Sequence, residues 1–154
     1  MTPPPRTRAQ RKQDALNRLE HDVDAWVATA DGGSGTPYLV PLSFLWDGGA
    51  FTLLIATPAS SPTSRNLRAT GKVRLGIGST RDLVLIEGIA QALAATEIPD
   101  AVGDAFAAKT GFDPRRLTNS YLYFRIYPRR LQAWREENEF EDRELMRDGQ
   151  WVIP

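Results

Sequence analysis

The segment TPASSPTSRN, residues 57–66, places several hydroxyl groups directly before a short helical pattern. The first turn of a helix has backbone N–H groups without intrahelical partners, and these groups favour an anion. Arginine adds a planar fork of donors that matches a phosphate. The pattern predicts a phosphate-binding cradle, although helix capping with solvated arginines would account for the same residues. The candidate binding residues are Thr57, Ser60, Ser61, Thr63, Ser64, Arg65 and Asn66.

A run without carboxylates surrounds this segment. The chain has 19 basic and 19 acidic residues and a formal net charge of zero, yet no acidic residue lies between Asp47 and Asp82. Cations without acidic neighbours in the sequence favour a local anion site, and the glycines of the run would let a ligand come close. The cations concerned are Arg65, Arg68, Lys72, Arg74 and Arg81.

Nucleic acid fits the same charges less well. General nucleic-acid binders carry a basic excess, which this chain lacks as a whole. The run from residue 65 to residue 81 also contains no aromatic side chain on which a base could stack. A basic-patch nucleic-acid binder is therefore a distant alternative, and no nucleic-acid partner is expected.

Several other chemistries lack the side chains that they need. No cysteine is present, which excludes thiolate zinc sites and a cysteine nucleophile. The single histidine, His21, lies near the end of a predicted helix, where a cation is stabilised, and we expect a structural role for it. Ser34 lies in a GGSGT turn rather than in a nucleophile elbow. We therefore expect no metal site and assign no catalytic acid, base or nucleophile.

The elements that must position these residues are mostly β-strands. A first helix is indicated by apolar residues spaced three and four apart over residues 16–23, and another is expected from Thr96 as its cap to Gly111 as its end. Pro41 cannot donate a ladder hydrogen bond, so its strand is an edge, is bulged or is broken. The expected strands cover residues 25–30, 36–46, 50–57, 72–79, 82–94, 121–128 and 131–136, with a short helix over 64–69 and a terminal hairpin ending at Trp151.

Six or seven antiparallel strands with two or three peripheral helices predict a mostly β fold built on a small closed barrel, because closure removes exposed edges. The length of 154 residues suits one domain. We expect a disordered, basic and proline-rich tail over residues 1–9 and a single domain over residues 10–154. No apolar run is long enough for a membrane helix and no secretion signal is evident, so the cytoplasm is the expected location.

Three motifs, in their order and spacing, resemble the pyridoxamine 5′-phosphate oxidase-like flavin-binding split-barrel family. They are PYLVPLSFLWDGG, SRNLRATGKVRL and LVLIEGIA, and the resemblance extends over residues 27–93 and 133–151. It implies a six-stranded antiparallel split barrel of the flavin-binding type. It also implies a homodimer with flavin sites at the subunit interface. The apolar C-terminal residues point to a dimer as well, because they have little core left to join.

The resemblance also implies positions for the cofactor. The strand matching Tyr38 to Phe44 would present its backbone to the isoalloxazine ring, and residues 57–66 would hold the phosphate. Trp134 is a candidate to cover the ring, whereas Trp46 is better explained as a core or interface aromatic. Family members often have a lysine at the position of Thr63, so one charge partner of the phosphate is missing here. The candidate ring-binding residues are Val40, Pro41, Leu42, Ser43 and Trp134.

We expect a flavin-dependent oxidoreductase that binds FMN and acts on an unidentified small-molecule substrate. FMN ends in one phosphate, which hydroxyls, helix amides and an arginine can satisfy. A deazaflavin carries a longer anionic tail that calls for an extended basic groove, and the missing lysine disfavours it. Lys72 and Arg74 lie on the same strand face and could contribute to such a groove. A deazaflavin-dependent reductase and a non-catalytic flavin-binding protein are therefore kept as alternatives.

Overall fold

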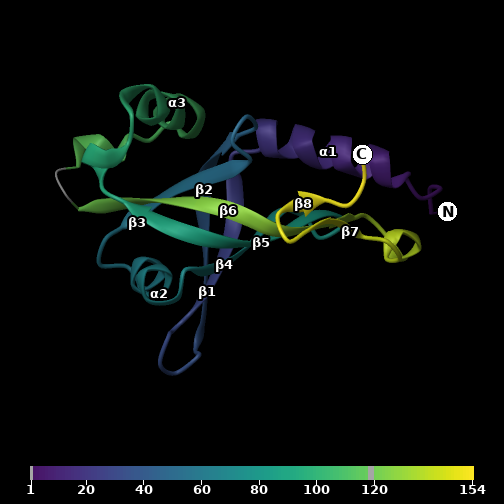
Figure 1. The fold of residues 1–154 in the computed structure, drawn as a ribbon, viewed down its shortest axis with the longest axis horizontal. Helices are drawn as coiled ribbons and strands as arrows, with labels where there is room; N and C mark the ends of the chain where they lie inside the picture. Colours follow the sequence, from purple (N-terminus) through teal and green to yellow (C-terminus); the bar gives the residue numbers. More distant parts are fainter. Residues whose placement is uncertain (1, 118–119) are drawn as a thin grey trace.

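One antiparallel sheet closes on itself to form a barrel (Figure 1). The computed structural model describes residues 2–117 and 120–154. The strands are β1 (Asp24–Ala30), β2 (Pro37–Asp47), β3 (Thr52–Pro58), β4 (Lys72–Ser79), β5 (Asp82–Leu93), β6 (Tyr121–Trp134), β7 (Glu144–Arg147) and β8 (Gln150–Trp151). Their order in the sheet is β3-β2-β1-β4-β5-β6-β7-β8, and β3 also pairs with β6. The predicted mostly β fold with a six-stranded antiparallel barrel is confirmed, and β7 and β8 extend it.

In the described part of the chain, three α-helices cover the outside of the barrel. They are α1 (Arg8–His21), α2 (Pro62–Thr70) and α3 (Asp100–Thr110), with short 3-10 turns at Ala95–Glu97, Pro114–Arg116 and Glu137–Glu139. Figure 1 shows α1 and α3 on one side of the barrel and α2 on the other, with both chain ends beside β7 and β8. The hairpin between β1 and β2 projects away from the barrel at the bottom of this view. None of the helices in the described residues is long and apolar enough to cross a membrane.

Inward-facing residues of the six barrel strands form the main core. Side chains alternate between the two faces of a strand, and in β4 the residues Val73, Leu75 and Ile77 are buried between more exposed neighbours. Phe44 of β2 and Phe124 of β6 are fully buried in the same cluster. This packing fixes the strands that carry the candidate site.

A second, smaller core lies outside the barrel beneath α3. Phe106 of α3 packs edge-on against Tyr123 of β6, with ring centroids 5.5 Å apart. Leu54 of β3 and Ile98, just before the helix, are buried in the same cluster. This cluster attaches α3 to the two strands whose pairing closes the barrel.

The start of α3 differs from the prediction. Thr96 lies in a separate 3-10 turn, and the helix begins at Asp100. The turn is closed by the carboxylate of Glu97, which accepts a hydrogen bond from the backbone N–H of Ala94 at 2.8 Å. Gly111 ends the helix with a φ of 75°, as predicted. The carboxylate of Glu97 therefore caps the 3-10 turn, whereas α3 itself follows Pro99 without a side-chain cap.

The strand β6 is longer than predicted. We expected two strands separated after Pro128, but β6 continues through this proline. Pro128 pairs with Gly88 of β5 and Arg130 pairs with Glu87, which leaves Arg129 as an extra residue in the register. Such a β-bulge interrupts the hydrogen-bond ladder, and for this reason a residue without a backbone N–H is tolerated there.

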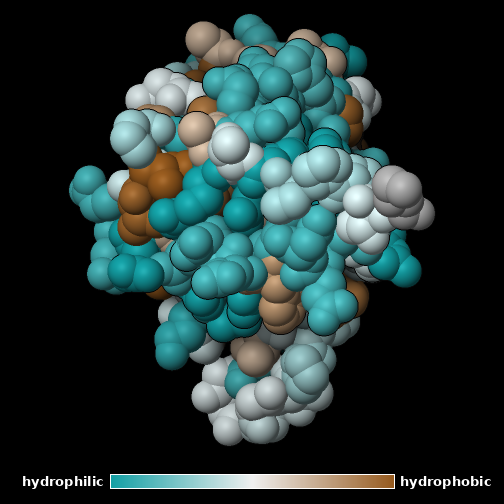
Figure 2. Space-filling view, turned by 90° about the vertical axis from the view of Figure 1, so that its right-hand side faces the viewer, coloured by the Kyte–Doolittle hydropathy of each residue, from teal (hydrophilic) through white to brown (hydrophobic). Residues whose placement is uncertain are grey.

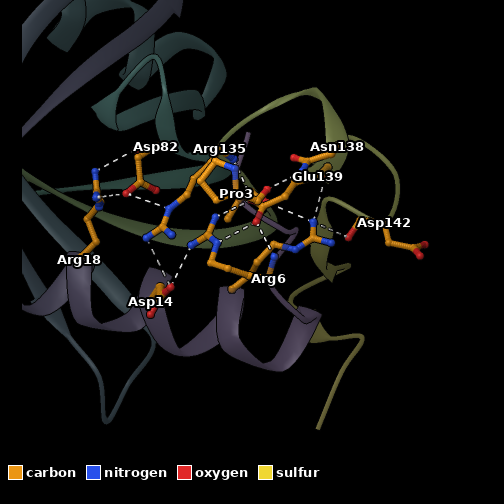
Figure 3. A network of polar contacts seen from close by, with 11 residues as sticks. Pro3, Arg6, Asp14, Arg18, Asp82, Arg135, Asn138, Glu139 and Asp142 are labelled. Carbon is orange, nitrogen blue, oxygen red and sulfur yellow. Dashed lines mark hydrogen bonds and ion pairs between the residues drawn. The ribbon is translucent and has the colours of Figure 1, made fainter. Parts of the chain in front are cut away.

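Residues 6–9 differ from the expectation of a disordered tail over residues 1–9, of which Met1 lies outside the described residues. Thr7 caps α1, and the helix begins at Arg8. Arg6 is only 9% exposed, and its backbone N–H and guanidinium both bind the carboxylate of Glu139, which follows β6 (Figure 3). A buried arginine needs such a partner, and this one lies 133 positions further along the chain.

Candidate functional site

The candidate cradle lies where β3 ends and α2 begins. Ser61 caps α2 by accepting a hydrogen bond from the backbone N–H of Ser64 at 3.1 Å. Pro62 follows as the first helical residue, where a missing N–H leaves no hydrogen bond unmade. Thr57 Oγ1 lies 3.1 Å from the hydroxyl of Ser61, and the first turn of the helix contains no acidic residue. A hydroxyl-rich helix N-terminus is thus present at the predicted place.

Four of the predicted cradle residues are buried, and Thr57 is one of them. Ser64 donates its hydroxyl to the carbonyl oxygen of Pro58 at 2.7 Å. Asn66 donates its side-chain amide to the hydroxyl of Thr29 in β1 at 3.1 Å. Thr63 is also buried. The two hydrogen bonds hold α2 against the end of β3 and against β1, so these side chains position the helix, while their direct contact with a ligand stays a prediction.

The exposed part of the cradle consists of Ser60, Arg65 and Arg68, with Ser61 half-buried beside them. Arg65 Nη1 donates to the carbonyl oxygen of Ser60 at 2.6 Å, and Arg68 Nη2 donates to that of Ala59 at 2.7 Å. Carbonyl oxygens orient a guanidinium group without neutralising its charge. Because neither arginine forms an ion pair within the described residues, both can still bind a phosphate.

Two cations of the acid-free run have acidic partners from distant segments. Arg74 of β4 forms an ion pair with Glu87, which lies opposite it in β5. Arg81 Nη1 lies 2.9 Å from Glu136 Oε2, beyond the end of β6. The other three cations of the run have no ion-pair partner in the described part of the chain. Strand pairing therefore supplies acids to some cations that have none nearby in the sequence.

The strand β2 provides a free backbone edge next to the cradle. Its residues 37–43 pair with β1, but its pairing with β3 begins only at Phe44. Continuing that register would bring Leu42 opposite Thr57, so the unpaired edge and the cradle border the same opening in the barrel. Pro41 lies in this unpaired stretch, in agreement with its missing N–H. Free N–H and C=O groups of such an edge can bind a planar ligand that carries several polar atoms.

The side chains of this edge alternate between the core and the outer surface. Val40 and Leu42 pack against the core, whereas Pro41 is exposed. Ser43 donates its hydroxyl to Asp24 Oδ1 at 2.7 Å. The feature that these four predicted ring-binding residues share is therefore their backbone and not a common side-chain surface.

The hairpin between β1 and β2 packs close to α2. A Cβ added at Gly32 would lie 3.3 Å from the side chain of Ala69. In the same turn, backbone N–H groups led by that of Ser34 hold the pKa of Asp31 below its ordinary value, and the charge of Arg65 acts in the same direction. A carboxylate that stays ionised thus lies near the cradle without forming an ion pair with Arg65.

Trp134 lies at the opposite end of β6 from the cradle. Tyr121, the first residue of β6, pairs with Pro58 beside the cradle, whereas Trp134 pairs with Leu83 near the start of β5. The two ends are about 40 Å apart along the strand at the usual rise per residue. Within one chain, Trp134 is therefore not brought to the predicted phosphate site.

Trp134 instead lines a separate hollow of about 610 Å³. Phe140 packs edge-on against it, with ring centroids 5.6 Å apart. The guanidinium carbon of Arg143 lies 4.2 Å from the centroid of the Phe140 ring. Arg81 and Glu136 also line this hollow. The tryptophan therefore belongs to a partly exposed cluster of aromatic and charged side chains.

Metal-binding groups are not gathered in the described residues. Across residues 2–117 and 120–154, no set of three or more histidine, aspartate or glutamate side chains is placed to hold a metal ion. His21 is the last residue of α1, and its Nδ1 lies 2.8 Å from the carbonyl oxygen of Asn17. This contact within the helix is in keeping with a structural role at the helix end.

Arg129 was not singled out from the sequence. The bulge in β6 brings this residue to the same hollow as Lys72 of β4, with a volume of about 470 Å³. The motif YPRR contained a signal, because a proline inside an apolar strand pattern can mark a bulge as well as the end of a strand. We interpreted Pro128 only as the end of a strand.

Comparison with known proteins identifies relatives at the level of the family. A family model described as pyridoxamine 5′-phosphate oxidase matches residues 13–135. No curated protein matches the chain. The match spans β1 to β6 and so includes both the cradle and the free edge of β2.

Solved structures resemble the fold at low sequence identity. A candidate pyridoxamine 5′-phosphate oxidase from Listeria innocua has a TM-score of 0.63 and 20% identity, over 82% of this chain and 98% of the other. A protein named F420 reductase has a TM-score of 0.59 and 18% identity, over 75% and 93%. An FAD-binding protein from Mesorhizobium loti has a TM-score of 0.60 and 20% identity, over 77% and 90%. At sequence identities this low, the similarity to these three structures shows a common fold and nothing further.

Proposed function

Since the chain belongs to the pyridoxamine 5′-phosphate oxidase family, we propose that it is an oxidoreductase that binds FMN and acts on a small-molecule substrate. The observation that carries this proposal is the cradle at the start of α2. There Arg65 and Arg68 are oriented by neutral carbonyl oxygens beside the helix N-terminus, and they keep their full charge for a phosphate.

The residues present fit both ends of a phosphorylated flavin. The backbone N–H of Thr63, the hydroxyls of Ser60 and Ser61 and the guanidinium of Arg65 would hold the phosphate, because the N–H groups of Ser64 and Arg65 already bind Ser61. The unpaired backbone of β2 over residues 38–43 would hydrogen-bond the polar edge of the ring. When bound, the flavin supplies the hydride chemistry, while the chain binds it, orients it and limits its contact with water.

Two pairings in the acid-free run favour FMN over a deazaflavin. A groove for a long anionic tail needs several free cations, but Arg74 and Arg81 are paired with Glu87 and Glu136. A single phosphate needs only the cations of the cradle. The neighbour named F420 reductase keeps the deazaflavin alternative open, because it carries the name of such a cofactor.

We propose that a second copy of the chain completes the site. Trp26 of β1 and Leu39 of β2 are 54% and 59% exposed on the outer face of the barrel, and together with Leu85 of β5 they line an apolar hollow of about 260 Å³. The face that carries the chain ends is mostly hydrophilic, with a hydrophobic patch at its edge (Figure 2). Exposed apolar surface of this kind favours an interface. In a dimer, Trp134 could reach the flavin of the partner, although it is distant from the cradle of its own chain.

The cofactor is tested by titrating the full chain with FMN, riboflavin and a deazaflavin, following absorbance and fluorescence. FMN should bind at least about tenfold more tightly than riboflavin, because charge-assisted bonds to the phosphate contribute roughly 1.5–3 kcal/mol. If the Kd for the deazaflavin is at least tenfold lower than that for FMN, a difference of about 1.4 kcal/mol in binding free energy, the deazaflavin is the cofactor and FMN is not. Failure of all three to bind would contradict the proposal.

Two further measurements address catalysis and assembly. To test catalysis, a reduced pyridine nucleotide is added to the FMN complex and reduction of the bound FMN is measured. If the FMN is not reduced, the non-catalytic alternative is favoured. Sedimentation of the FMN complex at micromolar concentration should give a dimer, and a monomer with full affinity for FMN would contradict the shared site.

A further inference from the structure

Tyr38 lies on the part of β2 that extends past β3 as a two-stranded ribbon with β1, which we call the ribbon (residues 28–39). The ladder between the two strands pairs Tyr38 with Thr29, while the pairing of β2 with β3 begins only at Phe44. Residues directly opposite each other in an antiparallel ladder have their side chains on the same face of the sheet. The direction of the Thr29 side chain therefore also gives the direction of the Tyr38 side chain.

The Thr29 side chain points to α2. It is buried, and its hydroxyl accepts a hydrogen bond from the side-chain amide of Asn66 at 3.1 Å. Further along the ribbon, Gly32 lies close to Ala69 of the same helix. The ribbon thus runs along α2 (Figure 1), and Tyr38 lies on the face of the ribbon that is turned to this helix.

The strand register gives the level of Tyr38 relative to the cradle. Phe44 pairs with Ile55, and continuing this register would bring Tyr38 to the level of Ser61. The strand β3 ends at Pro58, however, and the chain turns into α2 instead of continuing beside Tyr38. Tyr38 therefore lies across the opening from the cradle, at the level of the residue that caps the helix.

Tyr38 supplies a free side-chain donor on the β2 side of this opening. Among residues 37–43 of β2, only Tyr38 and Ser43 have polar side chains. The hydroxyl of Ser43 is bound to Asp24. The phenol of Tyr38 is partly exposed and has no hydrogen-bond partner within residues 2–117 and 120–154. It is therefore the side-chain donor that this stretch of β2 can offer to a ligand.

The face that carries the Tyr38 phenol differs from the face that we assign to a second copy of the chain. Side chains alternate along a strand, so Leu39 points away from α2. There it lines the apolar hollow together with Trp26 and Leu85, and Tyr38 does not line that hollow. A second copy on the outer face would thus cover Leu39 and leave the phenol turned to the cradle.

We propose that Tyr38 is a further binding residue of this site and that its phenol donates a hydrogen bond to the phosphate held by the cradle. The proposal rests on the proposed function, because the phosphate is that of FMN. The donors of the cradle all approach from the side of α2. The three terminal oxygens of a phosphate can accept further hydrogen bonds, and a phenol is a neutral donor suited to an anion. Tyr38 would bind the side of the phosphate that faces away from the helix.

The variant Tyr38→Phe removes only the hydroxyl and is tested by fluorescence titration of the full chain. It should bind FMN about tenfold more weakly than the wild type does and riboflavin equally well, because a hydrogen bond to a charged group is lost. Tyr127→Phe, which removes another partly exposed phenol, is the matched control and should leave both affinities unchanged. An unchanged FMN affinity of Tyr38→Phe, or an equal loss for FMN and riboflavin, would overturn the assignment.

A second probe separates the role of Tyr38 from the choice of cofactor. Inorganic phosphate is titrated into the cofactor-free full chain, and the ring signals of Tyr38 and Tyr127 are followed by NMR. Phosphate should shift the signals of Tyr38 and leave those of Tyr127 unchanged. If phosphate does so but FMN does not bind, the proposed function fails and the assignment of Tyr38 stands. If FMN binds equally well to the wild type and to Tyr38→Phe, the assignment fails and the proposed function stands. If neither ligand binds, both are wrong.

Discussion

Two arginine-rich regions of the molecule use the same side chain in opposite ways. The first, which we call the clasp, joins the N-terminal segment, α1 and the residues after β6, and contains Arg6, Asp14, Arg135 and Glu139 (Figure 3). The second is the cradle at the start of α2. In the clasp the charges are paired with one another, whereas in the cradle the arginines donate to backbone carbonyl oxygens.

The carboxylate of Glu139 is the centre of the clasp. It is 2% exposed and accepts hydrogen bonds from the backbone N–H of Arg6 at 2.8 Å, from Arg6 Nε at 3.0 Å and from Arg6 Nη2 at 2.8 Å. The backbone N–H of Arg135 adds a fourth at 2.8 Å. Asp14 of α1 binds the remaining guanidinium nitrogen of Arg6 at 3.0 Å. Four donor groups of the chain itself therefore surround this buried charge.

The clasp and the cradle show two states of an arginine charge: one is paired within the fold, and the other is still able to bind a ligand. A charge taken out of water must be paired, because desolvation would otherwise destabilise the fold. Once paired, it has little capacity for an outside ligand. Arg65 and Arg68 are exposed and incompletely satisfied, so they can bind an anion at small cost to stability. We therefore expect the arginines of the clasp to determine stability and those of the cradle to determine ligand binding.

The largest effect on stability should come from Glu139→Gln. This change leaves the side chain of Arg6, which is buried, without its main charge partner, and breaking a buried ion pair in this way costs about 3–5 kcal/mol of unfolding free energy. Urea denaturation at neutral pH measures the loss. Glu137→Gln, two residues earlier and exposed, is the matched control and should change stability by less than about 0.5 kcal/mol. Equal values for the two variants would show that the clasp is not a structural centre.

Acid should weaken the clasp over a defined range. The hydrogen bonds from Arg6 lower the pKa of Glu139 from 4.5 to about 2. Because the folded pKa is the lower one, the stabilisation is complete above the unfolded value and is lost as pH falls from about 4.5 to about 2, by up to roughly 3 kcal/mol. The stability difference between the wild type and Glu139→Gln should therefore shrink across this range. A difference that stays constant down to pH 2 would contradict the paired state of Glu139.

The barrel and the cradle could be predicted because their signals are local. Strand alternation is visible within β4, and Ser61 lies next to the helix that it caps. Closure of the barrel followed from the number of strands and from the need to cover their edges. Pro41 indicated an edge, a bulge or a break in its strand, and the pairing of β2 shows a free edge there.

The clasp and the bulge could not be predicted because their partners are far apart in the sequence. The residue that pairs with Arg6 lies beyond every strand of the barrel, so a proline-rich N-terminus was interpreted as a free tail. The partners of Arg74 and Arg81 depend on strand register, which single residues do not reveal. Pro128 carried an ambiguous signal, and only the pairing of β5 with β6 decides between a strand end and a bulge.

Within the cradle, a pair of serine variants should show which hydroxyl stabilises the start of α2. Ser61→Ala removes the side chain that caps α2 and should lower the unfolding free energy by about 1 kcal/mol. Ser60→Ala is the control, because Ser60 is exposed and its hydroxyl has no partner within the described residues, and it should change stability by less than about 0.5 kcal/mol. Thermal denaturation of both variants tests this. Equal losses would mean that the helix start is not held by its cap.

The smallest effect on stability and a large effect on binding should come from Arg65→Ala. The side chain is exposed and donates only to the carbonyl oxygen of Ser60, so its loss should change the unfolding free energy by less than about 0.5 kcal/mol. Its loss should weaken FMN binding about tenfold or more and leave riboflavin binding unchanged, because only FMN carries the phosphate. Fluorescence titrations of the variant and of Arg116→Ala, an exposed arginine outside the cradle, measure both affinities. Equal weakening of FMN and riboflavin, or a loss of stability as large as that of Glu139→Gln, would place Arg65 with the structural arginines and remove the contrast between the two regions.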